Sequence, residues 1–410
     1  MRRYELDWLR VGVVVGLIPA HAALIFGAPT ALGQMGSGPS PIIFGLVASF
    51  VLLWGMPLLF LAAGAGSWFA LTRRTGSRYL RERVLRLLVP LAVGVFVLVP
   101  LQAYLFLLSN PQLVTAGYIP GGFIHESDLR FLPDFYIAYM RALLAFLTHF
   151  SPTTALIFLQ HLWFIARLFV YSLVALPLFL ALRSPGGRRV IERVAGFIAR
   201  PGGVLLAGVP LALSEVLLET QWLTRLTASW RWPIYDDWAA FSLSLIFFVA
   251  GYLVYADERI VPAIQRQGPV TLGVGLVAWA VIVGVGIAGK LPANEFSLGY
   301  VLFMLLRGLG TWWTVFGIFH LVLRFLSGPR RVLGFLSEAS YPIYLTHFVI
   351  LTAVAYVVVR WPVFWAVQYA TIVVGATALT FALYVLVLKR VPALRLLLGM
   401  RVRAAPDGQG

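Results

Sequence analysis

The chain has 410 residues, of which 60% are apolar and only 12% charged, a composition that excludes a soluble globular protein because too few polar residues remain for a water-facing surface. The net charge of +16 comes from Lys and Arg in short segments between apolar runs, which indicates membrane topology and argues against a nucleic-acid partner. The absence of cysteine excludes disulfides and cysteine-ligated zinc or iron–sulfur sites.

The sequence contains ten apolar runs of about 20 residues, the length that crosses a bilayer core as an α-helix. We therefore predict an all-α polytopic membrane helix bundle of about ten transmembrane helices, in a single domain over 1–390 with a tail over 391–410. The second run contains the Gly-rich stretch "LAAGAGSW", which predicts tilt, a break or close helix packing. The predicted spans are 8–27, 42–71, 84–108, 161–182, 203–220, 238–256, 269–288, 297–323, 339–359 and 363–388.

Basic residues predict the orientation of these spans. Most of the 32 Lys and Arg residues lie in the N-terminal segment, in the loops after spans two, four, six and eight, and in the tail. By the positive-inside rule both termini are therefore cytoplasmic. The opposite loops hold Arg130, Arg141, Arg225, Arg231, Lys290 and Arg360.

The longest loop, 109–160, then lies outside the cell membrane. Its run "FYIAYMRALLAFLTHF" is short for a crossing and predicts an interfacial or re-entrant helix. The alternative is that the segment 133–160 crosses the membrane, which reverses the orientation of every later span.

The first span carries three polar side chains, Asp7, Arg10 and His21. Arg10 and His21 are eleven residues apart, about three helical turns plus 20°, so they share one face about 16 Å apart along the axis. Asp7 is expected to pair with Arg10, and Pro19 to kink the helix near His21. An intramembrane His usually faces a bundle interior or a wet cavity; the alternatives are a helix–helix hydrogen bond for His21 and snorkelling for Arg10.

The basic loop after the second span reads "RRTGSRYLRERVLR" and places Arg83 and Arg86 at the start of the third. Guanidinium groups clustered at a helix start suit phosphates, because each offers a planar bidentate fork. The alternative is a purely topological role with contact to anionic lipids.

The fourth span begins at the outer surface with "HLWFIARLF". His161 and Trp163 are candidates for lining a ligand entrance, since aromatic faces stack on sugar rings, and the alternative is an interfacial aromatic belt. Arg167 is a charge deeper in the span, with Glu215 and Glu219 as candidate partners.

The ninth span opens with "SEASYPIYLTH". Ser337, Tyr341 and Tyr344 lie within about 60° of one another on a helix, and His347 lies about 60° further round. This pattern predicts a polar strip that faces the bundle interior. Interhelical hydrogen bonding by Tyr and His is the alternative interpretation.

Taken in order, these stretches resemble the acyltransferase-3 family of multi-pass membrane proteins. The family's basic residue, ten intervening residues and His match Arg10 and His21, and its Arg-x-x-Arg matches the pair in the basic loop. Its Tyr-x-x-Tyr-Leu-x-His matches the motif that ends at His347. The chain most resembles the branch that decorates osmoregulated periplasmic glucans. The stretches that carry the resemblance are "YELDWLRVGVVVGLIPAH", "MPLLFLAAGAGSWFALTRR", "YLRERVLRLLVPL", "HLWFIARLFVYSLVALPLF" and "LSEASYPIYLTHFVI".

The resemblance implies an integral O-acyltransferase of the cell membrane that moves an acyl group from cytoplasmic acyl-coenzyme A to a hydroxyl of an envelope or periplasmic carbohydrate. Acyl-coenzyme A is then a co-substrate, and no metal or permanently bound cofactor is expected. His21 is implied as general base, Asp7 and Arg10 at the inner mouth of a channel, and Arg83 and Arg86 at the donor's phosphates. The residues expected to line the channel are Ser67, His161, Trp163, Tyr341, Tyr344 and His347.

One departure concerns the second span, where the family often has Ser before Gly and this chain has Ala63 before Gly64. The role of that hydroxyl is then missing or passes to Ser67. Intramembrane His, Arg and Glu also suit a secondary transporter of a polar or anionic solute, although the sequence has no convincing internal repeat. A third alternative is a binding scaffold without activity. The acyl group, the acceptor, an acyl-His intermediate and the oligomeric state stay open.

Overall fold

The computed structural model describes residues 3–27, 42–115, 117, 119, 122–148, 158–218, 238–293 and 297–400. Within these ranges the secondary structure is helical, without a strand, which confirms the predicted all-α class. The chain forms two compact units, each built from three separate segments. The first unit holds 1–13, 49–80 and 170–333, and the second holds 14–48, 81–169 and 334–410.

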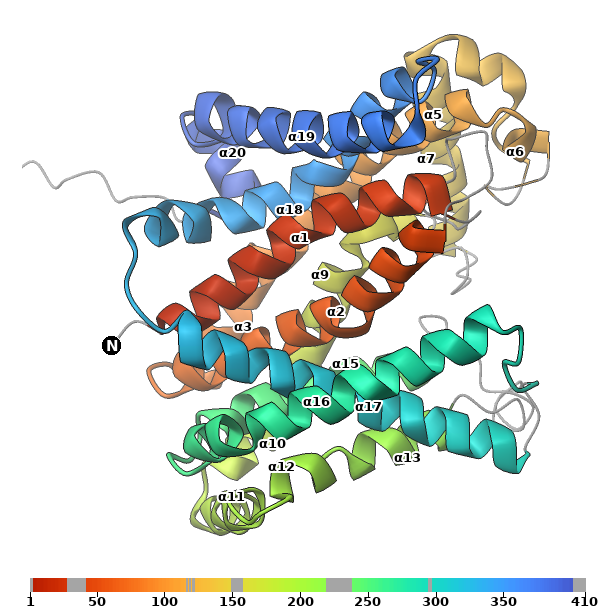
Figure 1. The fold of residues 1–410 in the computed structure, drawn as a ribbon. Coiled ribbons are helices and arrows are strands. Elements are labelled where there is room, and N and C mark those ends of the chain that lie inside the picture. Colours follow the sequence, from red (N-terminus) through yellow and green to blue (C-terminus); the bar gives the residue numbers. More distant parts are fainter. Residues whose placement is uncertain are drawn as a thin grey trace, which may run out of the picture. The chain divides into compact units, whose positions relative to one another are not determined.

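Figure 1 labels the helices in chain order. The longer helices are α1 (Tyr4–Gly27), α2 (Ile42–Leu71), α5 (Val99–Ser109), α7 (Leu132–Thr148), α9 (Trp163–Val174), α11 (Pro185–Ile198), α13 (Val209–Leu218), α15 (Trp238–Val254), α16 (Ile260–Ile287), α17 (Leu298–Phe325), α18 (Arg331–Val358) and α19 (Trp365–Leu383). The shorter helices are α3 (Gly76–Arg83), α4 (Val89–Val93), α6 (Gln112–Thr115), α10 (Leu176–Leu182), α12 (Gly203–Leu206) and α20 (Pro392–Leu397). Three π-helical turns are η1 (Val84–Leu88), η2 (Gly94–Leu98) and η5 (Tyr384–Leu388), and two 3₁₀ turns are η3 (Glu126–Arg130) and η4 (Gln160–Leu162).

In the described ranges seven helical segments are long and apolar enough to cross a bilayer, and two bent helix pairs raise the number to nine if each pair is one span. The sixth predicted span is α15, an apolar helix of 17 residues. The polytopic helix bundle is therefore confirmed, whereas the cytoplasmic placement of the termini stays a prediction. The seven segments are Tyr4–Phe26, Leu53–Leu71, Gly76–Ser109, Ile260–Ile287, Leu298–Phe325, Arg331–Val358 and Trp365–Leu388.

The fifth predicted span, 203–220, forms α12 and α13 after a bend of 119° from α11. Gly202 precedes α12 with a φ of 76°, a left-handed conformation that glycine adopts without a side-chain clash. A Cβ at the next residue, Gly203, would collide with the carbonyl oxygens of Phe197 and Ile198 at the end of α11. Two adjacent glycines therefore allow the chain to turn sharply where the apolar run begins.

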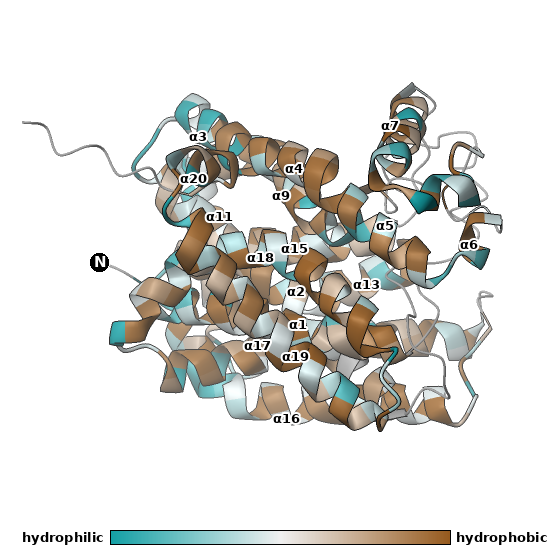
Figure 2. Cartoon of the chain, turned by 90° about the horizontal axis from the view of Figure 1, so that it is seen from above, coloured by the Kyte–Doolittle hydropathy of each residue, from teal (hydrophilic) through white to brown (hydrophobic). Residues whose placement is uncertain are grey.

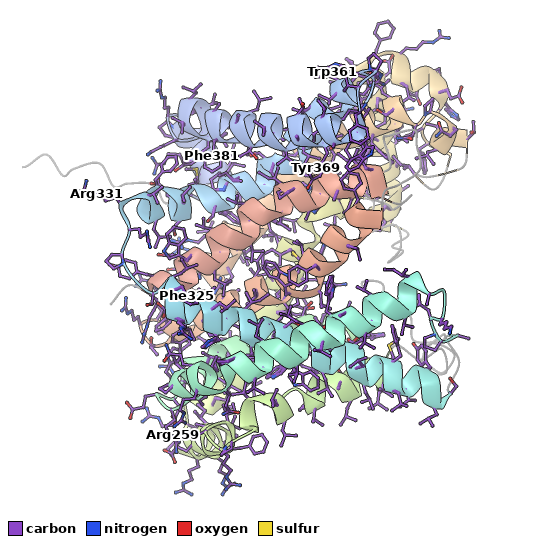
Figure 3. The ribbon with its side chains drawn as sticks, viewed as in Figure 1. Arg259, Phe325, Arg331, Trp361, Tyr369 and Phe381 are labelled. Atoms are coloured by element: carbon purple, nitrogen blue, oxygen red, sulfur yellow. The ribbon has the colours of Figure 1, made fainter. Side chains whose placement is uncertain are left out.

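In the first unit, α16 and α17 lie side by side (Figure 1). Gly268 and Gly275 are seven residues apart on one face of α16, and a Cβ at either position would overlap α17, at His320 and Thr314 respectively. Small residues let membrane helices approach closely, so these glycines account for the tight pair. Elsewhere α16 is dominated by hydrophobic residues (Figure 2), and Val277 is 64% exposed, as suits a surface in contact with hydrocarbon. Arg259 directly precedes α16 (Figure 3).

The Gly-rich stretch of α2 also packs closely, against α15 in the first unit. A Cβ at Gly64 would collide with the Phe248 carbonyl oxygen, and a Cβ at Gly251 would collide with that of Leu61. On each helix a glycine thus packs directly against the backbone of the other helix. Of the three alternatives that the sequence left for "LAAGAGSW", close helix packing is confirmed.

In the second unit, the C-terminal half of α1 packs with α18 and α19. Tyr369 of α19 (Figure 3) donates a hydrogen bond to the Pro19 carbonyl oxygen at 3.1 Å. Helix α1 continues through Pro19 as one helix. The buried core of this packing consists of Ile18, Ala22, Ala23, Ile25, Phe26, Phe44, Leu351, Ala355, Val358, Ile372 and Ala376.

The third span contains two π-helical turns, each closed by a proline-containing α-turn. The backbone N–H of Val89 donates to the Val84 carbonyl oxygen, and the backbone N–H of Val99 donates to the Gly94 carbonyl oxygen. Pro90 and Pro100 follow, and a proline lacks the N–H that donates to the carbonyl four residues earlier in an α-helix. Those carbonyls, Arg86 and Phe96, accept instead from two tyrosines of the second unit, Tyr341 at 2.8 Å and Tyr136 at 3.0 Å. Side chains thereby satisfy the polar groups that the prolines release in an apolar setting.

The predicted interfacial segment "FYIAYMRALLAFLTHF" falls on α7, apart from its last two residues, which lie outside the described ranges. Helix α7 is amphipathic: Phe135 and Tyr139 are buried, whereas Ile137 and Leu144 are more than half exposed. The helix itself is thus confirmed. Whether it lies in the interface or crosses the bilayer is a matter of orientation and stays a prediction.

Candidate active site

Three histidines from distant parts of the sequence meet in the second unit. His21 comes from α1, His161 from the 3₁₀ turn before α9, and His347 from the middle of α18. His21 Nδ1 lies 3.0 Å from His347 Nε2, and the two rings are stacked with centroids 5.2 Å apart. The His161 ring packs edge-on to that of His347 at 5.4 Å. At most 7% of any of the three side chains is exposed.

The backbone fixes which nitrogen of each neutral ring carries the proton. His347 Nδ1 lies 2.8 Å from the Tyr344 carbonyl oxygen and 3.1 Å from that of Ile343. A carbonyl oxygen only accepts, so Nδ1 of His347 carries the hydrogen and its Nε2 carries the lone pair. His21 must then donate from Nδ1 to His347, which leaves the His21 lone pair on Nε2.

The same argument applies to His161. Its Nε2 lies 3.1 Å from the Leu345 carbonyl oxygen and therefore carries the hydrogen, so its Nδ1 carries the lone pair. The Tyr344 hydroxyl donates to the His161 carbonyl oxygen, which ties the start of α9 to α18. Phe348 contacts the rings of His21 and His161 and closes one side of the cluster. Of the predicted channel residues, the structure thus brings His161, Tyr344 and His347 together with His21.

A glutamine pair that the sequence analysis did not single out lies next to His161. Gln102 of α5 donates from Nε2 to Oε1 of Gln160 at 3.1 Å, and both side chains are buried. Gln160 has a φ of 46°, the single positive φ of a non-glycine residue in the described ranges. The signal for Gln102 was present in the sequence, because an amide deep in an apolar span is costly unless it has a role.

Arg10 and Ser67 lie together in the first unit, on the Gly-rich face of α2. The Arg10 guanidinium donates to the Ala62 carbonyl oxygen at 3.4 Å and lies over Gly66, where a Cβ would be 3.3 Å from Nη2. Ser67 donates to the Ala63 carbonyl oxygen at 3.0 Å, and its hydroxyl lies 2.9 Å from that of Tyr79. The expected pairing of Asp7 with Arg10, on the preceding turn of α1, stays a prediction.

The basic pair of the loop lies in the second unit. Arg83 ends α3 and is half-buried, whereas Arg86 lies in the π-helical turn η1 and is exposed. The backbone of Arg86 is held by Tyr341, whose hydroxyl donates to its carbonyl oxygen. Tyr341 thus makes the interhelical hydrogen bond that the sequence left as one of its two interpretations. A phosphate contact by the two guanidiniums stays a prediction.

Two further charged residues of the spans contact side chains within their own units. The Arg167 guanidinium lies over the Trp163 ring, 4.8 Å from its centroid, in a cation–π contact. Glu215 of α13 forms an ion pair with Arg307 of α17. The sequence had offered Glu215 as a partner of Arg167 and had not considered Arg307; Glu219, the other candidate, lies outside the described residues.

At the start of α1, Glu5 is buried and lies next to Tyr255, which follows α15. The Tyr255 hydroxyl donates to Glu5 at 3.0 Å, and Arg3 lies 3.8 Å from the same carboxylate. A carboxylate oxygen only accepts, so the Tyr255 phenol is the donor in this contact. This cluster anchors the first turn of α1 within the first unit.

Hydrogen bonds occupy four of the six ring nitrogens in the histidine cluster. Two ring nitrogens face each other, and two others donate to carbonyl oxygens. No group of His, Asp or Glu in the described ranges is arranged to hold a metal ion. What the cluster offers is one imidazole, His21, whose orientation and tautomer are fixed by a second.

In a comparison with protein families, the model of the acyltransferase domain known as acyltransferase 3 matches residues 3–385. The match covers all four stretches of the chain that hold the three histidines and the two arginines of the basic loop. No curated protein and no solved structure matches the chain.

Proposed function

The chain belongs to the acyltransferase-3 family of membrane acyltransferases, and from this premise we propose that it transfers an acyl group from acyl-coenzyme A to a hydroxyl of an envelope or periplasmic carbohydrate. Family membership supports the acyl transfer itself. The donor, the acceptor and the catalytic residues are parts of the proposal, as are the glucan-modifying branch and the location in the cell membrane.

The observation that carries the proposal is the hydrogen bond of 3.0 Å between His21 and His347. With Nδ1–H held by His347, His21 directs a lone pair from Nε2. This nitrogen removes the proton from the acceptor hydroxyl as its oxygen attacks the thioester carbonyl carbon. The carbon–sulfur bond then breaks, and the coenzyme A thiolate takes the proton back from the His21 imidazolium. The products are an ester and the free thiol.

The donor is placed at Arg83 and Arg86. Coenzyme A carries several phosphate groups, and two guanidiniums offer charge-assisted, bidentate hydrogen bonds to them. Arg86 is exposed, and its backbone is held by Tyr341, so a fixed main chain supports a solvent-accessible charge. Asp7 and Arg10 stand at the predicted inner end of α1, and Ser67 and Trp163 remain candidates for lining the path of the substrates.

The test is transfer of label from acetyl-coenzyme A to carbohydrate by the purified protein in vesicles. Replacing His21 by Ala should lower kcat by a factor of 10² or more, the usual contribution of general base catalysis. His320→Gln is the matched control, because His320 is another buried histidine, in α17, that the mechanism does not use. Full activity of His21→Ala would overturn the assignment. Solute flux without thioester consumption would support a transporter instead.

The donor site has its own test. The double variant Arg83→Ala with Arg86→Ala should weaken coenzyme A binding, and the loss should be larger at low salt because ions screen the charges. Arg188→Ala with Arg189→Ala is the control, since it removes two charges from α11. Binding that is equally weak in both double variants would point to net charge, and unchanged binding would remove Arg83 and Arg86 from the site.

A further inference from the structure

The buried side-chain atoms of the second unit that lack a hydrogen-bond partner among the described residues include Gln102 Oε1 and His161 Nδ1. Each of these side chains is 3% exposed. Buried polar atoms are almost always satisfied, and leaving one unpaired costs free energy comparable to the loss of a hydrogen bond. Two such atoms on side chains of one hydrogen-bonded cluster therefore indicate a ligand.

The two atoms belong to one cluster. Gln102 is hydrogen-bonded to Gln160, the residue directly before His161. The left-handed backbone at Gln160 is unfavourable for a residue with a side chain, and such strain is found at functional sites. The Tyr344 hydroxyl holds the His161 carbonyl oxygen on the other side. The surrounding contacts thus fix the position of both acceptors.

The hydrogen-bond polarity of the cluster selects its ligand. In the observed arrangement Gln102 donates one N–H of its amide to Gln160, and His161 donates its single N–H to the Leu345 carbonyl oxygen. The two atoms without a partner, Gln102 Oε1 and His161 Nδ1, can only accept hydrogen bonds. A ligand with several O–H donors satisfies both atoms, whereas an ether or ester oxygen satisfies neither.

We propose that Gln102 and His161 form a subsite that binds hydroxyl groups of the acceptor carbohydrate next to the His21–His347 pair. The inference rests on the proposed function and names the part of the protein that recognises its acceptor. A sugar ring carries neighbouring hydroxyls, so one can be held at His161 while another is presented to the base. The ring of His161 lies 5.4 Å from that of His347. The amide N–H groups of acyl-coenzyme A share the donor chemistry, and the experiment separates the two sources.

The closing experiment compares two substitutions of His161 that divide its two nitrogens. His161→Gln places an amide near Nε2, which keeps the bond to Leu345 and removes the acceptor at Nδ1. His161→Asn places an amide oxygen near Nδ1 and breaks the bond to Leu345. Binding of a linear β-glucan oligosaccharide is measured by calorimetry without acyl-coenzyme A, together with the thermal unfolding midpoint. Binding of acetyl-coenzyme A is measured in parallel.

We expect His161→Gln to bind the oligosaccharide about 3- to 10-fold more weakly, the effect of one lost hydrogen bond, at an unchanged unfolding midpoint. His161→Asn should bind it nearly as well as wild type but unfold at a lower temperature. If His161 served only to hold the Leu345 carbonyl oxygen, His161→Asn would bind the oligosaccharide more weakly than His161→Gln. Gln102→Met should also weaken binding, and it serves as the second variant if His161→Gln does not fold. His320→Gln should leave oligosaccharide binding unchanged, because His320 belongs to the first unit.

Three results would overturn the proposal. The first is equal oligosaccharide binding by wild type, His161→Gln and Gln102→Met, and the second is no oligosaccharide binding by the wild type. The third is a loss of binding confined to acetyl-coenzyme A, which would assign the subsite to the donor. If the wild-type protein binds the oligosaccharide but transfers no label to it, the proposed function is wrong and the subsite is still supported. The two failures are therefore distinguishable.

Discussion

At the scale of single residues, the central feature is a fixed tautomer. His347 is held by two backbone carbonyls of its own helix, and it in turn holds His21. The acceptor role of His347 toward His21 requires only a lone pair at the position of Nε2. Its basicity is needed only if the proton travels on from His21. These two roles can be separated by substitution.

We predict that His347→Gln keeps kcat within about 10-fold of wild type, because the amide oxygen lies near the position of Nε2 and still accepts from His21. His347→Asn places its amide at the level of Nδ1 and should lower kcat by a factor of about 10². Steady-state kinetics with purified variants measures both, and KM for the donor should not change. An equal loss in the two variants would mean that His347 accepts the proton itself.

The sequence predicted His21 and His347 as separate site residues but did not predict the hydrogen bond between them. His21 and His347 were singled out because a histidine inside an apolar span needs a polar partner. They are 326 positions apart, and no helical period relates two separate helices, so their hydrogen bond required the packed structure. Gln102 was missed because a single amide forms no motif, and its partner Gln160 lies at a turn whose backbone strain no local pattern reveals.

At the scale of helices, the contact between α2 and α15 makes a direct prediction. Gly64→Ala should destabilise the protein by about 1–3 kcal/mol, the usual cost of overpacking, because the new methyl group meets the Phe248 carbonyl oxygen. Gly284→Ala in α16 is the control: a Cβ there has open space, and alanine favours a helix. Thermal unfolding in detergent compares them. A loss in Gly284→Ala as large as in Gly64→Ala would contradict the packing argument.

The helices themselves were largely predictable, because runs of about 20 apolar residues between basic loops have few other solutions in a bilayer. The bend before α12 was not, since the predicted span began after it and Gly202 alone did not reveal a turn of 119°. Close packing of "LAAGAGSW" was one of three alternatives, and only the carbonyl groups of the facing helix decide among them.

At the scale of the whole molecule, the absence of cysteine makes the predicted orientation directly testable. Single replacements Arg74→Cys, Arg189→Cys and Lys290→Cys each introduce the one thiol of the chain. A membrane-impermeant maleimide added to intact cells should label Lys290→Cys alone, and the other two only after permeabilisation. If α7 crosses the membrane, the labels of Arg189→Cys and Lys290→Cys exchange, whereas that of Arg74→Cys does not.

The two π-helical turns of the third span have a consequence for what lies beyond them. Each wide turn holds one residue more than an α-turn, and an extra residue rotates the rest of a helix by about 100°. Together η1 and η2 rotate α5 by about 200° relative to an uninterrupted helix. Without them the side of α5 that bears Gln102 would point nearly the opposite way. The number of residues in the two π-helical turns therefore determines the direction in which the Gln102 side chain points. Deleting one residue from either turn would rotate that side chain away from Gln160.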